Sequence, residues 1–417
     1  MAHAESLTVQ TKRRPLPQPE PGLTPETLIA RAEALRPLLR EQQAENDARG
    51  YYSDEIHRAF LDGGFYRVVQ PRLFGGYEFD YPTFIRVIMA LAEGHPSTAW
   101  CYTLGTSHGY LIASHWPEEA QADVFGPDGH ARVCQRATPA GTITPVDGGY
   151  IVDGTFGFCS GAPVSTHMVG SCMLSEGEGP PRAVSFVVRR DQYEVLPDWG
   201  GDISLGMQGS GSNSVKIDKV FVPTHHVVSA DVMISSLPFN DGTPGTALHG
   251  NPMYLGVAGG AFLTEFGAIF TGTARAAIEE FERILQSTHV PRQPGVMRTS
   301  DPEGLRALGK AMNLADAAEA VTMRAVEIHM EQVRRWSATG APITPEDTLQ
   351  VWGMAQEASE LGCRAVDMLF ERSGARASLR GQRMQRYFRD IQMYRIHTTA
   401  QPPFATMRAQ ARLGQTP

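Results

Sequence analysis

Apolar residues recur at helical spacing along the first part of the chain. Thr24 precedes Pro25, the pattern of an N-cap followed by a proline at the first helical position, and the apolar period then continues to Gly50. The same period predicts three further helices at residues 53–62, 81–93 and 97–114. We therefore expect a mainly helical domain over 24–128, after a proline-rich tail over 1–23 that is disordered or strapped to the surface.

The pattern changes near Ala131, where short β-branched runs alternate with turn residues. These runs predict strands at residues 150–152, 183–188 and 214–222. We therefore expect residues 129–240 to form an antiparallel β-barrel or sandwich.

Beyond Pro252 the helical period returns and continues to the end of the chain. It predicts four long helices at about 253–287, 302–336, 345–373 and 379–412. Four long helices in succession favour a bundle over residues 241–417. The predicted fold class is α+β, with an N-terminal helical domain, a central antiparallel β domain and a C-terminal four-helix bundle.

Composition narrows the class of protein. The 417 residues include 37 Lys and Arg against 45 Asp and Glu, and the net charge of -8 argues against nucleic acid or an anionic membrane as a partner. No apolar run reaches the ~18 residues that a membrane span needs. Five cysteines without a C-x-x-C pair favour a reducing compartment, so we expect a cytoplasmic protein.

Two short motifs suggest chemistry that their context does not favour. The glycines of 206–211 resemble a dinucleotide-binding loop, but they lead into a predicted strand instead of opening a helix, so we interpret them as a turn near a ligand. His225 and His226 have no third ligand at useful spacing and no H-E-x-x-H motif exists, so no metal site is expected.

Several stretches, taken together, resemble the acyl-CoA dehydrogenase fold over roughly residues 25–412. They are Gly63-Gly64-Phe65 to Gly75-Gly76, the predicted strand that ends in Cys159-Ser160-Gly161, the run 206–222, and Arg386-Tyr387-Phe388-Arg389-Asp390.

Within that fold, the chain is more similar to two-component flavin-dependent monooxygenases such as the oxygenase component of 4-hydroxyphenylacetate 3-hydroxylase. Three stretches carry this closer resemblance: Ser97-Thr98-Ala99-Trp100 with Ser107-His108, Gly157-Phe158-Cys159-Ser160-Gly161, and Arg389-Asp390 with His397.

The resemblance implies an activity, cofactors and partners. Such enzymes take reduced FMN, or alternatively reduced FAD, from a separate NAD(P)H flavin reductase and use O2 to form a flavin C4a-hydroperoxide. The expected reaction is hydroxylation of an aromatic, phenolic small molecule. The expected assembly is a homotetramer or a dimer.

The resemblance also assigns candidate catalytic and substrate residues. It places Ser160 near the flavin N5, His397 beside the flavin, Trp100 against its ring and His108 at the substrate hydroxyl, where a histidine suits proton removal. Arg136 stands where related enzymes carry a small hydroxyl residue, and it favours an anionic or carbonyl-rich substrate, although it could instead face solvent or bind the flavin phosphate. Each of the other four also has a plain structural alternative, such as a core histidine bonded to a backbone carbonyl or a serine in an ordinary turn.

A second group of residues is assigned to the flavin phosphate or adenine, across a subunit interface. This group comprises Arg292, Ser373, Gly374 and Arg376.

Three alternatives remain open at this point. The first is a relative on the same fold that oxygenates nitrogen or sulfur, and the second is a non-catalytic flavin-binding scaffold. The third is an acyl-CoA dehydrogenase, which needs a carboxylate base either near 396–401 or at the start of the first bundle helix. Neither 396–401 nor 251–254 contains Asp or Glu, which argues against the third alternative.

Overall fold

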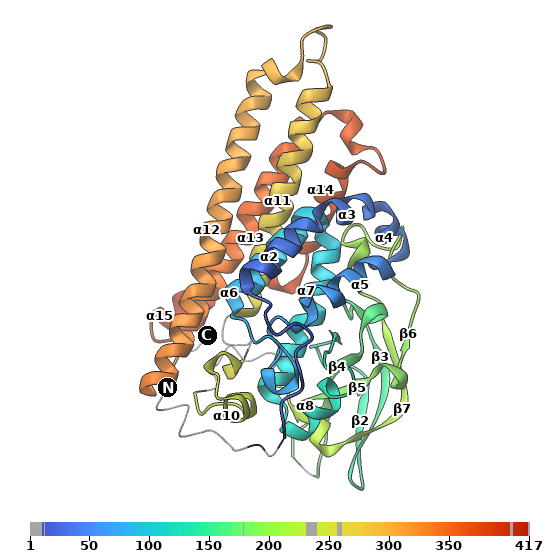
Figure 1. The fold of residues 1–417 in the computed structure, drawn as a ribbon, viewed down its shortest axis with the longest axis vertical. Helices are drawn as coiled ribbons and strands as arrows, with labels where there is room; N and C mark the ends of the chain where they lie inside the picture. The colour runs from blue at the N-terminus through green and yellow to red at the C-terminus, as the bar shows by residue number, and fades with distance from the viewer. Residues whose placement is uncertain are drawn as a thin grey trace.

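The computed structural model describes residues 11, 13–177, 179–230, 240–256, 261–400 and 403–415. An N-terminal group of helices lies between a β domain and a set of long helices that rise to one end of the molecule (Figure 1).

The N-terminal part is mainly helical, as the apolar period predicts. Its helices are α2 (Pro25–Ala34), α3 (Arg36–Glu41), α4 (Gln43–Arg49), α5 (Asp54–Asp62), α6 (Tyr81–Gly94), α7 (Pro96–His115) and α8 (Glu118–Phe125). The expected continuous helix up to Gly50 is wrong, because it breaks at Leu35 and Gln42. Pro37 follows the first break and lacks the N–H that a continuous helix needs. The last of these described helices, α8, was not predicted from the sequence.

The β domain contains two four-stranded sheets, with strand orders β1-β4-β5-β8 and β2-β3-β7-β6. The strands are β1 (Val133–Gln135), β2 (Thr142–Val146), β3 (Gly149–Phe156), β4 (His167–Leu174), β5 (Arg182–Arg189), β6 (Glu194–Val195), β7 (Val215–Pro223) and β8 (Val227–Ser229). The sheets share a core in which Phe156 and Phe186 meet edge to face at 5.6 Å. The expected antiparallel pairing is confirmed for β2–β3, β3–β7, β4–β5, β5–β8 and β6–β7. One short parallel pair, β1 with β4, adds to it.

The C-terminal part consists of long helices packed on α6 and α7. They are α11 (Ala261–Ser287), α12 (Pro302–Thr339), α13 (Pro345–Arg372), α14 (Arg383–Arg395) and α15 (Pro403–Arg412), and the short α10 (Pro244–His249) precedes them.

Two of the predicted bundle helices are wrong in their limits. The first was expected from Met253, but the described part of α11 begins at Ala261, and a 3₁₀ turn covers 252–255. The fourth was expected to be continuous over 379–412, yet α14 ends at Arg395 and α15 begins at Pro403. Proline has no backbone N–H to donate within a helix, and it disfavours helical backbone in the residue before it. A new helix therefore begins at Pro403.

Short 3₁₀ helices connect these elements. They are η1 (Phe65–Arg67), η2 (Arg72–Phe74), η3 (Ala162–Val164), η4 (Arg190–Gln192), η5 (Gln208–Ser210), η6 (Thr224–His226), η7 (Pro252–Leu255), η8 (Arg298–Ser300), η9 (Ala375–Ser378) and η10 (Thr398–Ala400).

A search of the described helices finds none that combines the length and apolar character of a membrane span. All five cysteines are buried with free thiols.

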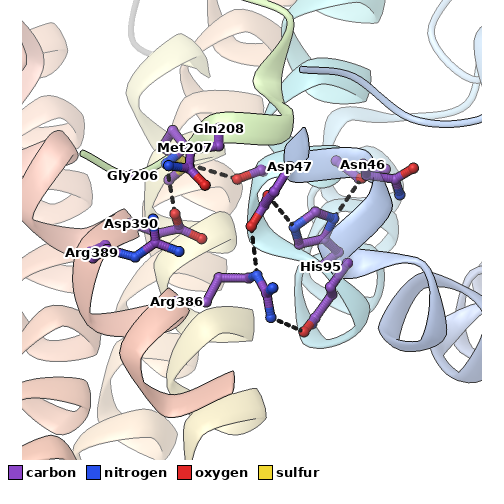
Figure 2. A network of polar contacts seen from close by, with 12 residues as sticks. Asn46, Asp47, His95, Gly206, Met207, Gln208, Arg386, Arg389 and Asp390 are labelled. Atoms are coloured by element: carbon purple, nitrogen blue, oxygen red, sulfur yellow. Dashed lines mark hydrogen bonds and ion pairs between the residues drawn. The ribbon is translucent and has the colours of Figure 1, made fainter. Parts of the chain in front are cut away.

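A buried ion pair joins segments that are far apart in the sequence. Arg386 on α14 donates from Nε to Asp47 Oδ2 on α4 at 2.6 Å, and its Nη1 donates to Gln43 Oε1 at 3.0 Å (Figure 2). The other carboxylate oxygen of Asp47 lies 3.2 Å from His95 Nε2, just before α7. The side chains of Arg386 and Asp47 are only 5% and 8% exposed, so each charge depends on the other.

These contacts decide the charge state of Asp47. Burial works against the charged carboxylate, but the contacts with His95 and Arg386 outweigh burial and hold the pKa of Asp47 below its usual value. A negative Asp47 therefore faces a positive Arg386 at neutral pH.

Helix α14 also holds the glycine-rich loop that follows Leu205. Asp390 accepts a 2.6 Å hydrogen bond from the backbone N–H of Met207 (Figure 2). A Cβ added at Gly206 would lie 2.2 Å from the backbone oxygen of Arg389, so only glycine permits this approach. Burial raises the pKa of Asp390 to about 7. The loop is thus fastened to α14 before it continues into β7.

We expect Asp47→Ala to lower the free energy of unfolding by about 3–5 kcal/mol, because it leaves the Arg386 guanidinium buried without compensation. Urea denaturation followed by circular dichroism measures this loss. The control is Asp191→Ala, whose 3.1 Å pair with Arg189 is solvent-exposed and is worth about 0–1 kcal/mol. Equal losses in the two variants would contradict the importance of the buried pair.

Candidate active site

A row of hydroxyl groups lies beside a tryptophan where the β domain meets α7. Trp100 Nε1 donates to Ser160 Oγ at 3.1 Å. Ser160 Oγ lies 2.8 Å from Ser212 Oγ, which lies 2.7 Å from Ser210 Oγ. All four side chains are buried. Because hydroxyls both donate and accept, this row can orient a proton toward or away from Ser160.

An aromatic wall continues from this row toward α11 and the break after α14. The Trp100 ring lies 4.9 Å from Phe266 and 5.5 Å, edge-on, from His397. Phe266 packs on Phe262 at 5.3 Å, and Phe262 stacks on His108 at 6.3 Å. The structure therefore brings Trp100, Ser160 and His397 together and connects His108 to them through two phenylalanines.

One face of α7 keeps contact with solvent although the helix is otherwise buried. The residues on this face are each 4–6% exposed: Trp100, Leu104, His108, Leu111 and His115. Their spacing of three or four residues places them on a single stripe, whereas Ala99, Ile112 and Ala113 are fully covered. These five residues therefore share the face of α7 that is slightly less covered than the face of Ala99, Ile112 and Ala113.

The backbone decides which nitrogen of His108 carries the proton. Its Nδ1 lies 2.9 Å from the carbonyl oxygen of Val133 on β1, and a carbonyl only accepts, so Nδ1 is the protonated nitrogen. Burial lowers the pKa of His108 to about 4, so the ring is neutral near pH 7. Its Nε2 consequently presents a lone pair.

The opposite arrangement holds at His397. The backbone N–H of Thr399 donates to His397 Nδ1 at 3.3 Å, and the Thr399 hydroxyl lies 2.8 Å from the same nitrogen. An N–H only donates, so Nδ1 is the acceptor and Nε2 carries the proton. Burial lowers the pKa of His397 and favours this neutral form. The two histidines thus have complementary roles, one accepting and one donating a proton at Nε2.

The backbone around Ser160 is unusual. Phe158, two residues before it, has φ +60°, and Gly161 after it has φ +80°. A non-glycine residue with positive φ costs free energy and is concentrated at functional sites. The Phe158 side chain is 68% exposed and contacts only the edge of Trp199 among the aromatic rings described, at 6.1 Å. The large apolar ring of Phe158 is therefore exposed to solvent two residues before Ser160.

Arg136 follows β1 and is half-buried. Its Nε is enclosed without a hydrogen-bond partner among the described residues. The guanidinium is close enough to the Cys159 thiol, next to Ser160, to interact with it electrostatically. Arg136 therefore holds an unused donor near Cys159, the neighbour of Ser160.

The predicted phosphate-binding residues lie elsewhere. Arg292 is in the exposed connection after α11, and Ser373, Gly374 and Arg376 follow α13 at the same end, where Arg298 donates to the Ser373 carbonyl. Helix α11 rises about 31 Å over the 21 residue steps from Phe266 to Ser287. Within one chain, this group cannot reach a ligand held at Ser160.

A buried carboxyl group lies near the start of the first bundle helix, where none was expected. The apolar period places that start near Met253, but the described part of α11 begins at Ala261 and carries Glu265 four residues later. The Glu265 carboxyl is buried and hydrogen-bonded to the Tyr81 hydroxyl on α6. Burial raises its pKa to about 8, so it is mostly protonated near pH 7. Glu265 is thus held toward α6 and is a poor base.

Sequence reasoning did not find several residues of this site. Ser210 and Ser212 complete the hydroxyl row, and Phe262 and Phe266 complete the aromatic wall. Only the serines had a usable signal, because they lie at the end of the glycine-rich stretch already interpreted as a turn near a ligand. The phenylalanines have ordinary core spacing.

Comparison with known proteins identifies the class. A family model described as the acyl-CoA dehydrogenase C-terminal domain matches residues 264–402. The chain superposes on the crystal structure of 3-HSA hydroxylase from Rhodococcus sp. RHA1 with a TM-score of 0.83 and 28% identity, covering 94% of this chain and 98% of that one. The fold is therefore that of the acyl-CoA dehydrogenases, as the sequence resemblance predicts.

Two relatives narrow the class. The flavin-dependent monooxygenase oxygenase subunit HsaA of Rhodococcus jostii (strain RHA1) is 29% identical over 383 residues, 90% of this chain and 94% of the relative. The oxygenase component of p-hydroxyphenylacetate 3-hydroxylase from Acinetobacter baumannii is 24% identical over 379 residues, 90% of this chain and 86% of the relative. The chain is a flavin-dependent monooxygenase built on the acyl-CoA dehydrogenase fold.

Proposed function

We propose that this chain is the oxygenase component of a two-component system and hydroxylates an aromatic, phenolic small molecule with reduced FMN or FAD and O2. A separate NAD(P)H flavin reductase supplies the reduced flavin. The observation that carries this proposal is the pair of complementary histidines, His108 and His397, at two ends of one aromatic wall. Relatives named as an oxygenase subunit and an oxygenase component support the proposal that flavin reduction and oxygenation are carried out by separate proteins.

The residues at the serine row fit a flavin ring. Trp100 offers a large aromatic face, and its N–H occupies one lone pair of Ser160. When Ser212 donates to Ser160, the Ser160 proton is free to point outward to a ring nitrogen. When bound, the reduced flavin supplies the electrons that activate O2. The chain's contribution here is to orient hydrogen bonds and to exclude water.

His108 is the proposed contact for the phenol hydroxyl. Its Nε2 lone pair accepts the hydroxyl proton, and this raises electron density at the ortho carbon that is to be oxygenated. His397 lies across Phe266 and Trp100, where its Nε2–H can donate to a reacting oxygen. Arg136 is the candidate for an anionic group on the substrate, because its Nε is enclosed without a partner among the described residues.

We also propose that the enzyme is a homo-oligomer, a tetramer or a dimer. Arg292, Ser373, Gly374 and Arg376 gather at the far end of the helices, about 31 Å along α11 from Phe266 of the aromatic wall. They serve a flavin only if that end lies against the site of a neighbouring subunit. In that arrangement, one subunit supplies the ring contacts and another supplies the phosphate or adenine contacts.

The proposal is tested by supplying reduced flavin with and without a reductase. We expect the purified chain not to oxidise NADH, and to hydroxylate phenols when a reductase or chemical reduction provides reduced flavin under air. Mass spectrometry with isotopically labelled O2 locates the inserted atom. NADH oxidation coupled to hydroxylation without a reductase would overturn the two-component assignment, and insertion only at nitrogen or sulfur would overturn the aromatic one.

Ser160→Ala is expected to uncouple the reaction, because it removes one hydrogen bond to the flavin worth about 1–1.5 kcal/mol, or roughly tenfold in rate. The ratio of hydrogen peroxide to hydroxylated product should rise by about that factor. Ser171→Ala is the matched control, since Ser171 is equally buried but pairs with Ser185 between strands. An unchanged ratio in Ser160→Ala removes this role.

His108→Asn is designed to keep a donor toward the Val133 carbonyl while removing the Nε2 acceptor. We expect kcat for hydroxylation to fall by about 10²–10⁴, with reduced flavin still consumed by O2. Because the pKa of His108 is about 4, wild-type activity that depends on its neutral form is kept above that pH and lost below it. A wild-type profile that loses activity through pH ~6.5 would instead assign the base to another group. His249→Asn controls for loss of a half-buried histidine outside the aromatic wall, because its Nε2 pairs with Gln121 Oε1.

A further inference from the structure

A cluster of possible metal ligands lies on the surface, away from the serine row. Asp123 on α8 places Oδ2 3.0 Å from His225 Nε2 and 3.0 Å from His226 Nε2, both on η6. All three ligand atoms lie within 4.8 Å of one another. The side chains are 54%, 31% and 11% exposed in the same order, so an ion can reach them from solvent. The expectation that the two histidines lack a third ligand is therefore wrong, because the fold supplies one from 102 residues earlier.

The distances suit a tetrahedral transition-metal ion. Zinc binds histidine nitrogen and carboxylate oxygen at ~2.0–2.2 Å, so neighbouring ligand atoms of a tetrahedral site are about 3.3 Å apart. The two Asp123 contacts at 3.0 Å approach this separation. Two histidines and one carboxylate also form a ligand set that occurs at zinc sites which keep a fourth position open.

The second nitrogen of His226 gives an independent argument. Nδ1 lies 3.2 Å from the carbonyl oxygen of Val187, while Nε2 faces the Asp123 oxygen. Both partners accept, and a neutral imidazole has only one N–H to donate. A metal ion on Nε2 removes the conflict, since Nδ1–H then donates to Val187 and Nε2 binds the ion. A backbone carbonyl on the free nitrogen is the usual outer contact of a metal-bound histidine.

The cluster is held on rigid elements. Trp116, fully buried between α7 and α8, donates from Nε1 to the His226 carbonyl at 3.0 Å. The three side chains thus already lie together, and they join α8 to η6, the turn between β7 and β8.

The fourth coordination position of such an ion would face a cavity beside Asp123 and His226. Asp123 and His226 line a cavity of about 530 Å³ that Arg13, Arg14 and Arg189 also line. Arg13 lies 3.6 Å from Glu118, and Arg189 lies 3.1 Å from Asp191, so these two positive charges are balanced by carboxylates. Arg14 has no ion pair among the described residues, and its charge favours a water or an anion as the fourth ligand.

We propose that Asp123, His225 and His226 bind one Zn²⁺-type divalent ion, which fastens α8 to the β domain and takes a water or a small anion from the arginine-lined cavity as its fourth ligand. The site is separate from the serine row. It therefore stands or falls independently of the monooxygenase function.

The test is metal titration of the full-length protein after chelator treatment. Calorimetry with ZnCl2 should give one ion per chain with a Kd of about 1 μM or lower, and the melting temperature should rise with added ZnCl2. Asp123→Asn and His225→Ala should each weaken binding by about 100-fold. His289→Ala, at an exposed position after α11, is the matched control and should bind as the wild type does.

Cobalt replaces zinc as a spectroscopic probe of the ligands. We expect Co²⁺ to show visible bands of a four-coordinate nitrogen and oxygen site without a thiolate charge-transfer band. A thiolate band would place the ion on the cysteines and overturn the proposal. So would equal affinity in Asp123→Asn, His225→Ala and the wild type, or no zinc binding up to ~100 μM. Chelated Asp123→Asn and His225→Ala that melt within a few degrees of the chelated wild type, yet do not respond to zinc, would support it.

Discussion

The buried pair between Asp47 and Arg386 is the contact on which the arrangement of the site depends. It connects α4 to α14, and through His95 it reaches the first turn of α7. Four residues after Arg386, Asp390 holds the backbone of Met207 in the glycine-rich loop. The tryptophan, the serine row and the segment that carries the second histidine all continue from elements fastened here. A charge enclosed at this junction cannot move without losing its compensation, so the junction has one stable geometry.

Backbone groups then decide the chemistry of the two histidines. A carbonyl beside His108 and an amide beside His397 select opposite tautomers from two identical side chains. The carbonyl belongs to β1, which pairs with β4, and the amide belongs to the turn where the last long helix is broken. Secondary structure thus assigns the direction of proton movement, and burial keeps both rings neutral.

Much of the fold could be predicted from local pattern. Thr24 and Ser53 accept hydrogen bonds from the first turns of their helices, and Gly50 ends α4 with φ +95°, as cap residues should. The errors have local causes as well. The apolar period alone does not show that a new helix starts at Pro403. Proline is tolerated in the first turn of a helix but breaks the interior of one, and the period looks the same in both cases. The short strand β1 was missed because three residues are too few to show alternation.

The sequence alone determined most of the long helices, the class of fold and, by resemblance to a family, the stretches that carry Trp100, Ser160, His108 and His397. Periodicity and capping are properties of neighbouring residues, so they can be seen in the chain itself. Only the tertiary structure decided which nitrogen of each histidine carries a proton, that the site ends in a row of serines, and that Asp123 meets a histidine pair on the β domain. The contacts of His108, Ser160 and Asp123 join residues that are 25, 52 and 103 positions apart, and no local pattern encodes them. His397 meets Thr399 only two residues away, but this contact forms because the fold breaks the helix after Arg395.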